Sequence, residues 1–192
     1  MTKTILSNKG KILDFIVVLI LVFGGGALRL LPHPPNFAPV AAMALFGGVY
    51  FSSKKLGLAL PILAMLISDI FIGFYYPLLM LSVYGSFLLC GILGIWLKKQ
   101  KKWYTVLGSS LSCSALFFII TNFGVWAFTP WYPKTLLGLA DCYIMAIPFF
   151  KNTLLGDLFY VTILFGVYEM VNLWIRNKFS ISQPTLAHKL EL

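Results

Sequence analysis

The sequence predicts an all-α integral membrane protein, a six-helix transmembrane bundle with its N- and C-termini in the cytoplasm. The composition, the length of the apolar segments and the positions of the basic residues support this prediction. Of the 192 residues, 59% are hydrophobic and 11% are charged, and the mean hydropathy is +0.89. Soluble domains carry about 25% charged residues, so this composition excludes an ordinary soluble protein.

The apolar segments have about the length that a helix needs to cross a bilayer, which is about 20 residues. No internal repeat or separable soluble domain interrupts them, so residues 1–192 are expected to form a single membrane domain. The predicted spans are approximately residues 14–31, 36–51, 56–74, 77–97, 103–129 and 153–175.

Most of the basic residues lie at the two termini or in two of the connections between apolar segments. Cytoplasmic loops of membrane proteins carry an excess of Lys and Arg, so twelve of the fifteen mark the cytoplasmic side. Arg29, Lys134 and Lys151 mark the opposite side. This topology and the anionic lipid headgroups account for the formal charge of +9, which therefore does not indicate a nucleic-acid partner. The twelve are Lys3, Lys9, Lys11, Lys54, Lys55, Lys98, Lys99, Lys101, Lys102, Arg176, Lys178 and Lys189.

The first two spans each have a feature that needs explanation. The first could be a signal peptide with a cleavage site among the small residues 24–27. An uncleaved helix explains more, because Arg29, a proline-rich turn and another apolar segment follow at once. The second span is short and follows His33-Pro34-Pro35. Proline excludes regular helix in that connector but suits a helix start, so a tilted or partly broken helix is expected.

The remaining spans have clear limits. The third begins after the basic turn Lys54-Lys55, and the fourth begins at Pro77. The fifth begins at Trp103 and the last ends before Arg176. Tryptophan and tyrosine gather at membrane interfaces, and aromatic residues near most of these ends agree with the assignment.

The segment between the fifth and last spans, residues 130–152, is long for a connector and apolar for a loop. About fourteen apolar-rich residues interrupted by Asp141 and Pro148 are too few for a crossing, so we expect an apolar interfacial or re-entrant segment before the last helix. The alternative is a seventh span. That alternative would export the basic C-terminal tail, against the charge rule.

Three ionisable residues within or beside the spans need a partner or an aqueous cavity, since a charge in the hydrocarbon costs about 2.5–3.5 kcal/mol on insertion scales. Arg29, Asp69 and Asp157 all fall near the outer ends of their helices. One interpretation is that Arg29 pairs with one or both aspartates merely to hold the bundle together. The other is that these residues line an outward-opening pocket under the apolar segment 134–150.

Helical spacing adds side chains to this proposed pocket. Asn122 and Trp126 are four residues apart and share a helix face, as do Thr153 and Asp157. Trp126 could equally be an interfacial anchor, and His33 is interpreted as a turn residue. The cationic groups favour a ligand that carries a carboxylate or phosphate, and the aromatic residues favour a ring. The predicted substrate-binding residues are Arg29, Asn36, Asp69, Asn122, Trp126, Lys151, Asn152 and Asp157.

Catalytic and metal-binding motifs are absent from the sequence. There is no HExxH, GxSxG or Walker loop, and no carboxylate cluster of the kind that binds Mg²⁺. Cys90, Cys113 and Cys142 have no metal-ligand or CxxC spacing, so no metal and no cofactor is expected. ATP hydrolysis is excluded for this chain.

Four segments carry a resemblance to a known family: RLLPHPPNFAPVAAMALFGG from Arg29, Ser68-Asp69, TNFGVW from Thr121, and AIPFFKNTLLGD from Ala146. They resemble a family of uncharacterised small bacterial membrane proteins. That family is in turn similar to the substrate-binding (S) components of energy-coupling factor (ECF) transporters. The resemblance implies a six-helix bundle that captures a vitamin-like molecule on the outer side. It also implies that transport needs a separate membrane scaffold subunit and cytoplasmic ATPases.

The sequence therefore favours a non-enzymatic, substrate-capturing subunit of an uptake transporter in the bacterial inner membrane. Its expected partners are the lipid bilayer and a small polar or anionic ring-containing ligand. One alternative is a non-catalytic assembly or scaffold protein whose polar cluster is purely structural. The other is a small membrane enzyme that uses Asp69 or Asp157 as a base on a lipid-derived substrate.

Overall fold

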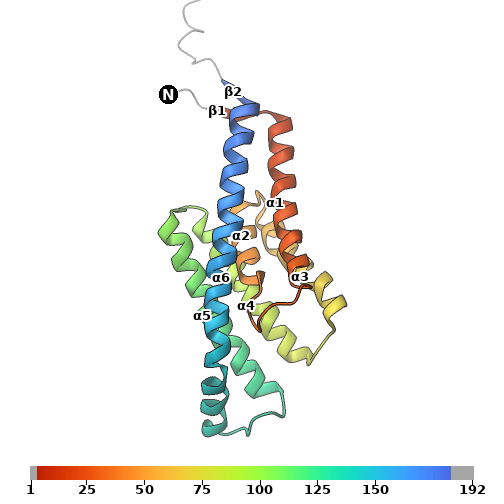
Figure 1. Ribbon diagram of the computed structural model, residues 1–192, viewed down its shortest axis with the longest axis vertical. Coiled ribbons are helices and arrows are strands. Elements are labelled where there is room, and N and C mark those ends of the chain that lie inside the picture. The colour runs from red at the N-terminus through yellow and green to blue at the C-terminus, as the bar shows by residue number, and fades with distance from the viewer. Residues whose placement is uncertain (1–3, 183–192) are drawn as a thin grey trace, which may run out of the picture.

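The structure, a computed structural model, describes residues 4–182 and is almost entirely helical (Figure 1). Two short strands, β1 (Thr4–Leu6) and β2 (Ser180–Ser182), pair in antiparallel fashion and bring the ends of the described chain together. The helices are α1 (Asn8–Leu28), α2 (Val40–Tyr50), α3 (Lys54–Ile72), α4 (Pro77–Leu97), α5 (Trp103–Phe128) and α6 (Leu136–Phe179).

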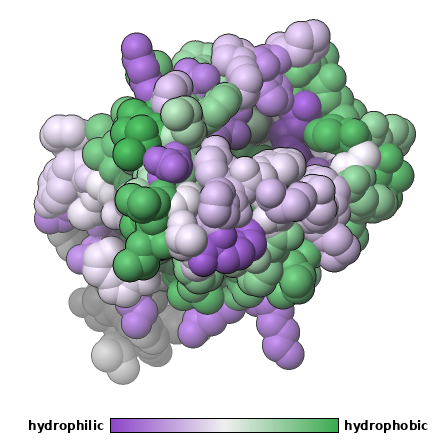
Figure 2. All heavy atoms as spheres, turned by 90° about the horizontal axis from the view of Figure 1, so that it is seen from below, coloured by the Kyte–Doolittle hydropathy of each residue, from purple (hydrophilic) through white to green (hydrophobic). Residues whose placement is uncertain are grey.

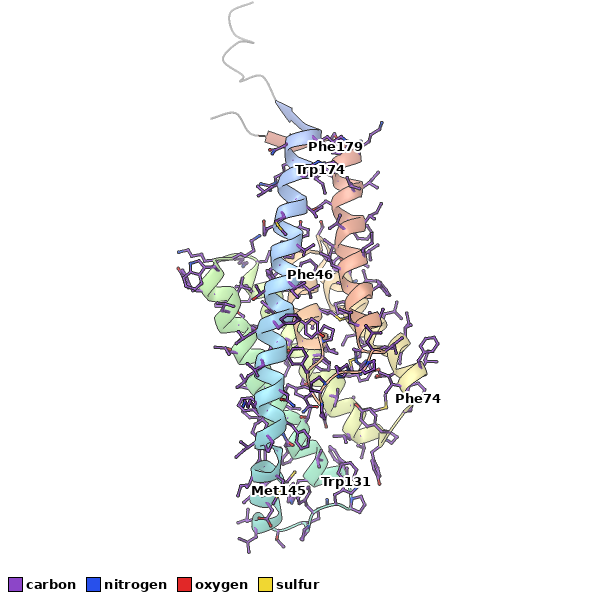
Figure 3. The ribbon with its side chains drawn as sticks, viewed as in Figure 1. Phe46, Phe74, Trp131, Met145, Trp174 and Phe179 are labelled. Carbon is purple, nitrogen blue, oxygen red and sulfur yellow. The ribbon has the colours of Figure 1, made fainter. Side chains whose placement is uncertain are left out.

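The predicted all-helical membrane fold is confirmed at this level. Five helices among the described residues, all except α2, are long and apolar enough to cross a membrane. Large apolar side chains cover the outside of the bundle. Phe74, Met145 and Trp174, which are labelled in Figure 3, are each more than half exposed by surface area. Such a surface suits lipid rather than water, so the chain is a multi-pass membrane protein.

Helix α2 lies at the centre of the bundle and is too short to cross it. Ten of its eleven residues, Val40–Val49, are buried against the surrounding helices. Eleven residues rise about 16 Å, roughly half of the 30 Å hydrocarbon core. The helix in the second predicted span, residues 36–51, is therefore shorter than predicted and covers only Val40–Tyr50. Pro39 is the N-cap, and the preceding residues form a loop that continues from the end of α1.

Glycines allow α4 to pack directly against the backbone of α2. A Cβ atom on Gly48 would overlap the carbonyl oxygen of Gly91, and one on Gly94 would overlap the carbonyl oxygen of Leu45. On the α3 side, a Cβ on Gly57 would lie 2.8 Å from the Gly47 carbonyl oxygen. Small residues let membrane helices approach closely, and here they fix the position of α2.

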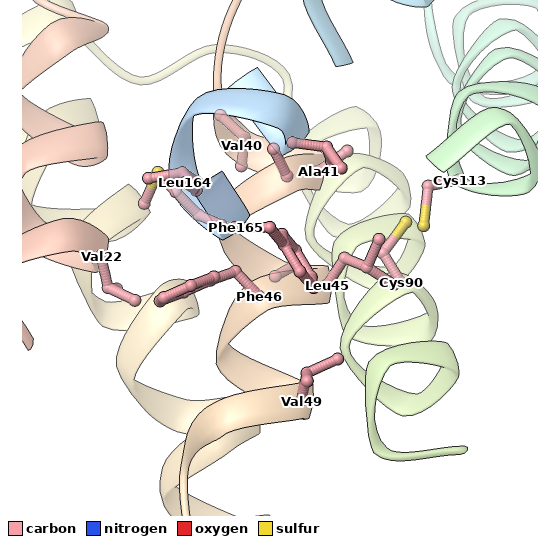
Figure 4. Close-up of a cluster of buried hydrophobic side chains, with 14 of the residues drawn as sticks. Val22, Val40, Ala41, Leu45, Phe46, Val49, Cys90, Cys113, Leu164 and Phe165 are labelled. Atoms are coloured by element: carbon pink, nitrogen blue, oxygen red, sulfur yellow. The ribbon is translucent and has the colours of Figure 1, made fainter. Parts of the chain in front are cut away.

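Large side chains from the outer helices complete the core around α2 (Figure 4). Phe46 of α2 meets Phe165 of α6 edge to face, with ring centroids 5.4 Å apart. Cys90 of α4 and Cys113 of α5 are buried in the same cluster. No polar residue occurs between Val40 and Val49, and most of these residues belong to one cluster of buried apolar side chains.

Helix α6 is continuous over 44 residues, which corrects the prediction of a separate interfacial or re-entrant segment followed by a span over 153–175. Pro148 lies within this helix and does not end it. The first part of α6 instead packs along the second half of α5. The Tyr143 hydroxyl donates to the Ile119 carbonyl at 2.6 Å, and the Phe118 and Phe150 rings lie 4.5 Å apart. At about 66 Å, α6 is longer than the membrane is thick.

The basic connections lie toward one end of the bundle, and the start of α1 and the end of α6 extend well beyond the α4–α5 connection (Figure 1). The Ser7 amide donates to the Phe179 carbonyl at 3.0 Å, which joins the start of α1 to the end of α6. The Lys98 ammonium donates to the Phe51 carbonyl at 2.8 Å, which joins the ends of α4 and α2. Ten of the twelve residues assigned to the cytoplasmic side lie in these regions. Lys3 and Lys189 lie outside the described residues.

The contact between α2 and α4 generates a prediction with a control on the same helix. We expect Gly94→Ala to destabilise the protein by about 1–3 kcal/mol, because the new methyl group overlaps the Leu45 carbonyl. Gly85→Ala should be neutral or stabilising, since nothing lies within 4 Å of the added atom and alanine favours helix. Thermal unfolding in detergent measures both variants. Equal midpoints for the two would contradict the proposed packing.

Candidate functional site

A cavity of about 360 Å³ lies at the N-terminal end of α2. The short helix α2 does not extend into this region, whereas the longer helices around it do. Val40 and Ala41, the first two residues of α2, form part of its wall. The first amides of α2 have no intrahelical acceptor, and no side chain of the described residues caps them. The polar and aromatic-hydroxyl residues of the wall are Arg29, His33, Asn36, Tyr75, Thr153 and Asp157.

A second cavity of about 190 Å³ adjoins the first and extends toward the α5–α6 hairpin. It adds Thr121 and Asn122 of α5 and Ala146 and Phe149 of α6. Figure 2 shows this end of the molecule, with hydrophilic residues across the middle of the face and hydrophobic residues toward its sides. The residues common to both cavities are Asn36, Tyr75, Val83, Phe117 and Thr153.

Arg29 and Asp69 form an ion pair at the edge of the main cavity. The Arg29 Nη1 atom lies 2.8 Å from the Asp69 Oδ1 atom, and the two side chains are 15% and 1% exposed. Arg29 also donates to the Ser68 hydroxyl at 2.5 Å, and the Tyr84 hydroxyl donates to Asp69 Oδ2 at 2.6 Å. Asp69 does not line the cavity itself. Its carboxylate balances the charge of Arg29 from the side of Arg29 that faces away from the cavity.

Asp157 lies in the wall of the same cavity, one turn after Thr153 on α6. Its side chain is buried, and its Oδ2 atom accepts a hydrogen bond of 2.6 Å from the Ser114 hydroxyl of α5. The described residues place no Lys or Arg within ion-pair distance of this carboxyl. Arg29 and Asp157 therefore differ, because within residues 4–182 Arg29 has a counter-charge and Asp157 has none.

The loop between α1 and α2 covers the cavity and is fastened to α6. Asn36 has a left-handed backbone, with φ of 62°, which asparagine tolerates better than most residues. The Asn152 side chain donates to the Pro35 carbonyl at 3.0 Å. The Phe37 ring packs against Tyr160 at 5.5 Å, and Gly156 leaves room for the Phe37 backbone. The proline-rich turn is thus a fixed wall of the cavity.

The structure brings together only part of the predicted site. Arg29, Asn36 and Asp157 line the main cavity and Asn122 lines the adjoining one. Asp69 and Asn152 do not line either cavity but contact residues at its edge. Asp69 pairs with Arg29, and Asn152 donates a hydrogen bond to the α1–α2 loop.

The other two predicted residues lie outside both linings. The Trp126 ring nitrogen donates to the Pro133 carbonyl at 3.0 Å, while Lys134 donates to the carbonyls of Trp126 and Thr129. These contacts fasten the α5–α6 turn. Lys151 is exposed.

Several lining residues were missed by the sequence interpretation. His33, interpreted as a turn residue, faces the cavity, and its Nδ1 atom lies 3.0 Å from the Pro34 carbonyl oxygen. Tyr75 lies in the α3–α4 connection, where burial, followed by the nearby Asp69 carboxylate, raises its pKa to about 12. It therefore remains a neutral hydrogen-bonding phenol. Its position directly after the third span was the available signal.

The fold and the site define a multi-pass membrane protein with a polar cavity at one end of a helical bundle. The chain belongs to the family of unknown function DUF6580, which matches residues 10–181. No curated protein matches the chain, and no solved structure matches it. Nothing in this family or in the described residues points to catalytic activity. Within residues 4–182, no group of three His, Cys, Asp or Glu side chains is placed to hold a metal.

The Arg29–Asp69 pair yields a prediction about stability. We expect Arg29→Met to destabilise the protein by about 3–5 kcal/mol, because it leaves the buried Asp69 carboxyl without its counter-charge. The double variant Arg29→Met/Asp69→Leu should regain most of this loss, since neither charge remains. Thermal unfolding in detergent measures the difference. A double variant no more stable than Arg29→Met would show that the pair does not stabilise the bundle through its charges.

Proposed function

We propose that the protein captures a small, polar, ring-containing molecule in the cavity at the end of α2, as the substrate-binding subunit of an uptake transporter. The observation that carries this proposal is the cavity itself. Its polar groups converge from four separate parts of the chain: the end of α1, the α1–α2 loop, the α3–α4 connection and α6. Convergence of a few polar groups in a pocket within a bundle is typical of a ligand site.

The volume and the wall of the cavity support this proposal. About 360 Å³ falls within the usual range of small-molecule sites, about 300–1,000 Å³. Phe87 and Phe117 are stacked, with ring centroids 5.1 Å apart and an interplanar angle of 20°. Both belong to the wall, so a flat ligand would find an aromatic surface there. The amides of Asn36 and Asn122 supply both donors and acceptors.

The proposed orientation places this cavity on the outer side of the bacterial inner membrane. The basic residues at the opposite end of the bundle support it, because Lys and Arg concentrate in cytoplasmic connections. Both termini would then be cytoplasmic. A ligand would enter from outside through the face formed by the α1–α2 loop and the α5–α6 hairpin.

Transport by such a subunit requires an energy source that this chain does not contain. The sequence has no Walker loop. The resemblance to ECF S components suggests a separate membrane scaffold subunit with cytoplasmic ATPases. An assembly protein without a ligand is the second candidate. It is favoured by one observation, that the Arg29–Asp69 pair is already satisfied within the protein.

Mass spectrometry of the purified protein tests the proposed function. We expect a small molecule to co-purify with the wild type and to be lost from Val83→Trp, which fills the space shared by both cavities. Leu88→Trp is the control, because it places the same side chain on the exposed face of α4. No molecule with either the wild type or the control, or equal amounts with Val83→Trp, would favour the assembly protein.

A further inference from the structure

The charge of the cavity wall indicates the chemistry of its ligand, an inference that rests on the proposed function. Among residues 4–182, three groups at or beside the cavity carry a formal charge when ionised: Arg29, Asp69 and Asp157. Arg29 and Asp69 cancel each other through their 2.8 Å ion pair. The charge that remains belongs to Asp157.

The two other cations expected on this side do not balance Asp157. Lys134 is engaged by the backbone carbonyls of Trp126 and Thr129. Lys151 is exposed and is not part of either cavity wall. The expectation of an anionic ligand depended on Arg29, Lys134 and Lys151 facing the site together, and the structure separates them.

One oxygen of Asp157 is available to a ligand. Oδ2 accepts the Ser114 hydroxyl, whereas Oδ1 has no hydrogen-bond partner among the described residues. The side chain is 3% exposed, and its residue belongs to the cavity wall, so this oxygen is reached from the cavity and not from the outer surface. A carboxyl in the membrane interior pairs with a donor or cation, because an unpaired charge is costly there.

We propose that the ligand presents a positively charged N–H group, such as a protonated amine, to the Oδ1 atom of Asp157. Its apolar or aromatic body then lies against Phe87 and Phe117, which face the same cavity. The ammonium supplies a counter-charge that no described Lys or Arg provides, and the Ser114 hydroxyl holds the carboxylate in place from the α5 side. Charge-assisted hydrogen bonds of this kind are about twice as strong as neutral ones.

Three probes of nearly equal size and different charge test this inference: benzylamine, benzyl alcohol and benzoate. We expect benzylamine, protonated at neutral pH, to raise the thermal midpoint of the detergent-solubilised protein at concentrations at least tenfold lower than benzoate or benzyl alcohol. Asp157→Asn should weaken the benzylamine response at least tenfold, because the charge is removed while the shape is kept. Asp141→Asn, an exposed position on the same helix, should leave it unchanged.

A stronger response to benzoate than to benzylamine, an equal response to all three probes, or no response to any of them would overturn the inference. So would a benzylamine response unaffected by Asp157→Asn. If that variant does not fold, the comparison of the three probes on the unmodified protein decides the question. A co-purified molecule that lacks a basic nitrogen would refute this inference while the proposed function stands. Absence of any bound molecule would count against the proposed function itself.

Discussion

Direct contact between the backbones of α2 and α4 determines where the other parts of the structure lie. Gly48, Gly91 and Gly94 allow this contact, and they hold an eleven-residue helix at the centre of a bundle whose other helices are at least 19 residues long. A central helix of half the membrane thickness leaves a space beyond its N-terminus. The α1–α2 loop and the outer ends of the longer helices enclose that space. The cavity is therefore a consequence of helix length and packing, and it does not depend on any single polar residue.

Two carboxyl groups near this cavity have opposite roles. Asp69 is buried beside Arg29 and accepts a hydrogen bond from Tyr84, so its negative charge is satisfied within the protein. Asp157 has a hydroxyl partner and no cation in the described chain. From the sequence alone, Asp69 and Asp157 could not be told apart in role, because both lie near the outer end of a predicted apolar span. Their different surroundings separate a residue that stabilises the bundle from one that can meet a ligand, so the structural and functional interpretations of the polar cluster are both needed.

The sequence was informative about features set by local composition. The helix over Pro77–Leu97 has the predicted bounds, and α3 and α5 differ from prediction by no more than two residues at either end, because basic or proline-containing connections flank them. The sequence was misleading where tertiary packing determines a helix boundary or the position of a side chain. Asp141 and Pro148 suggested an interruption inside what is a continuous helix, because a charged residue and a proline break an apolar run in the sequence. Trp126 shares a helix face with Asn122, yet the Pro133 carbonyl draws its ring to the α5–α6 turn and away from the cavity. The contact of Ser114 with Asp157 could not be predicted, since the two residues are 43 positions apart in the sequence.

The central claim is that the cavity at the end of α2 opens to the outer side of the membrane. Cysteine labelling in intact cells with a membrane-impermeant maleimide tests it most directly, since Cys90, Cys113 and Cys142 are buried and give little background. His33→Cys reports on the exposed loop in the cavity wall, and Ser52→Cys reports on the exposed turn at the opposite end of α2. The account predicts labelling of His33→Cys in intact cells and of Ser52→Cys only after the membrane is opened. The reverse pattern would contradict it.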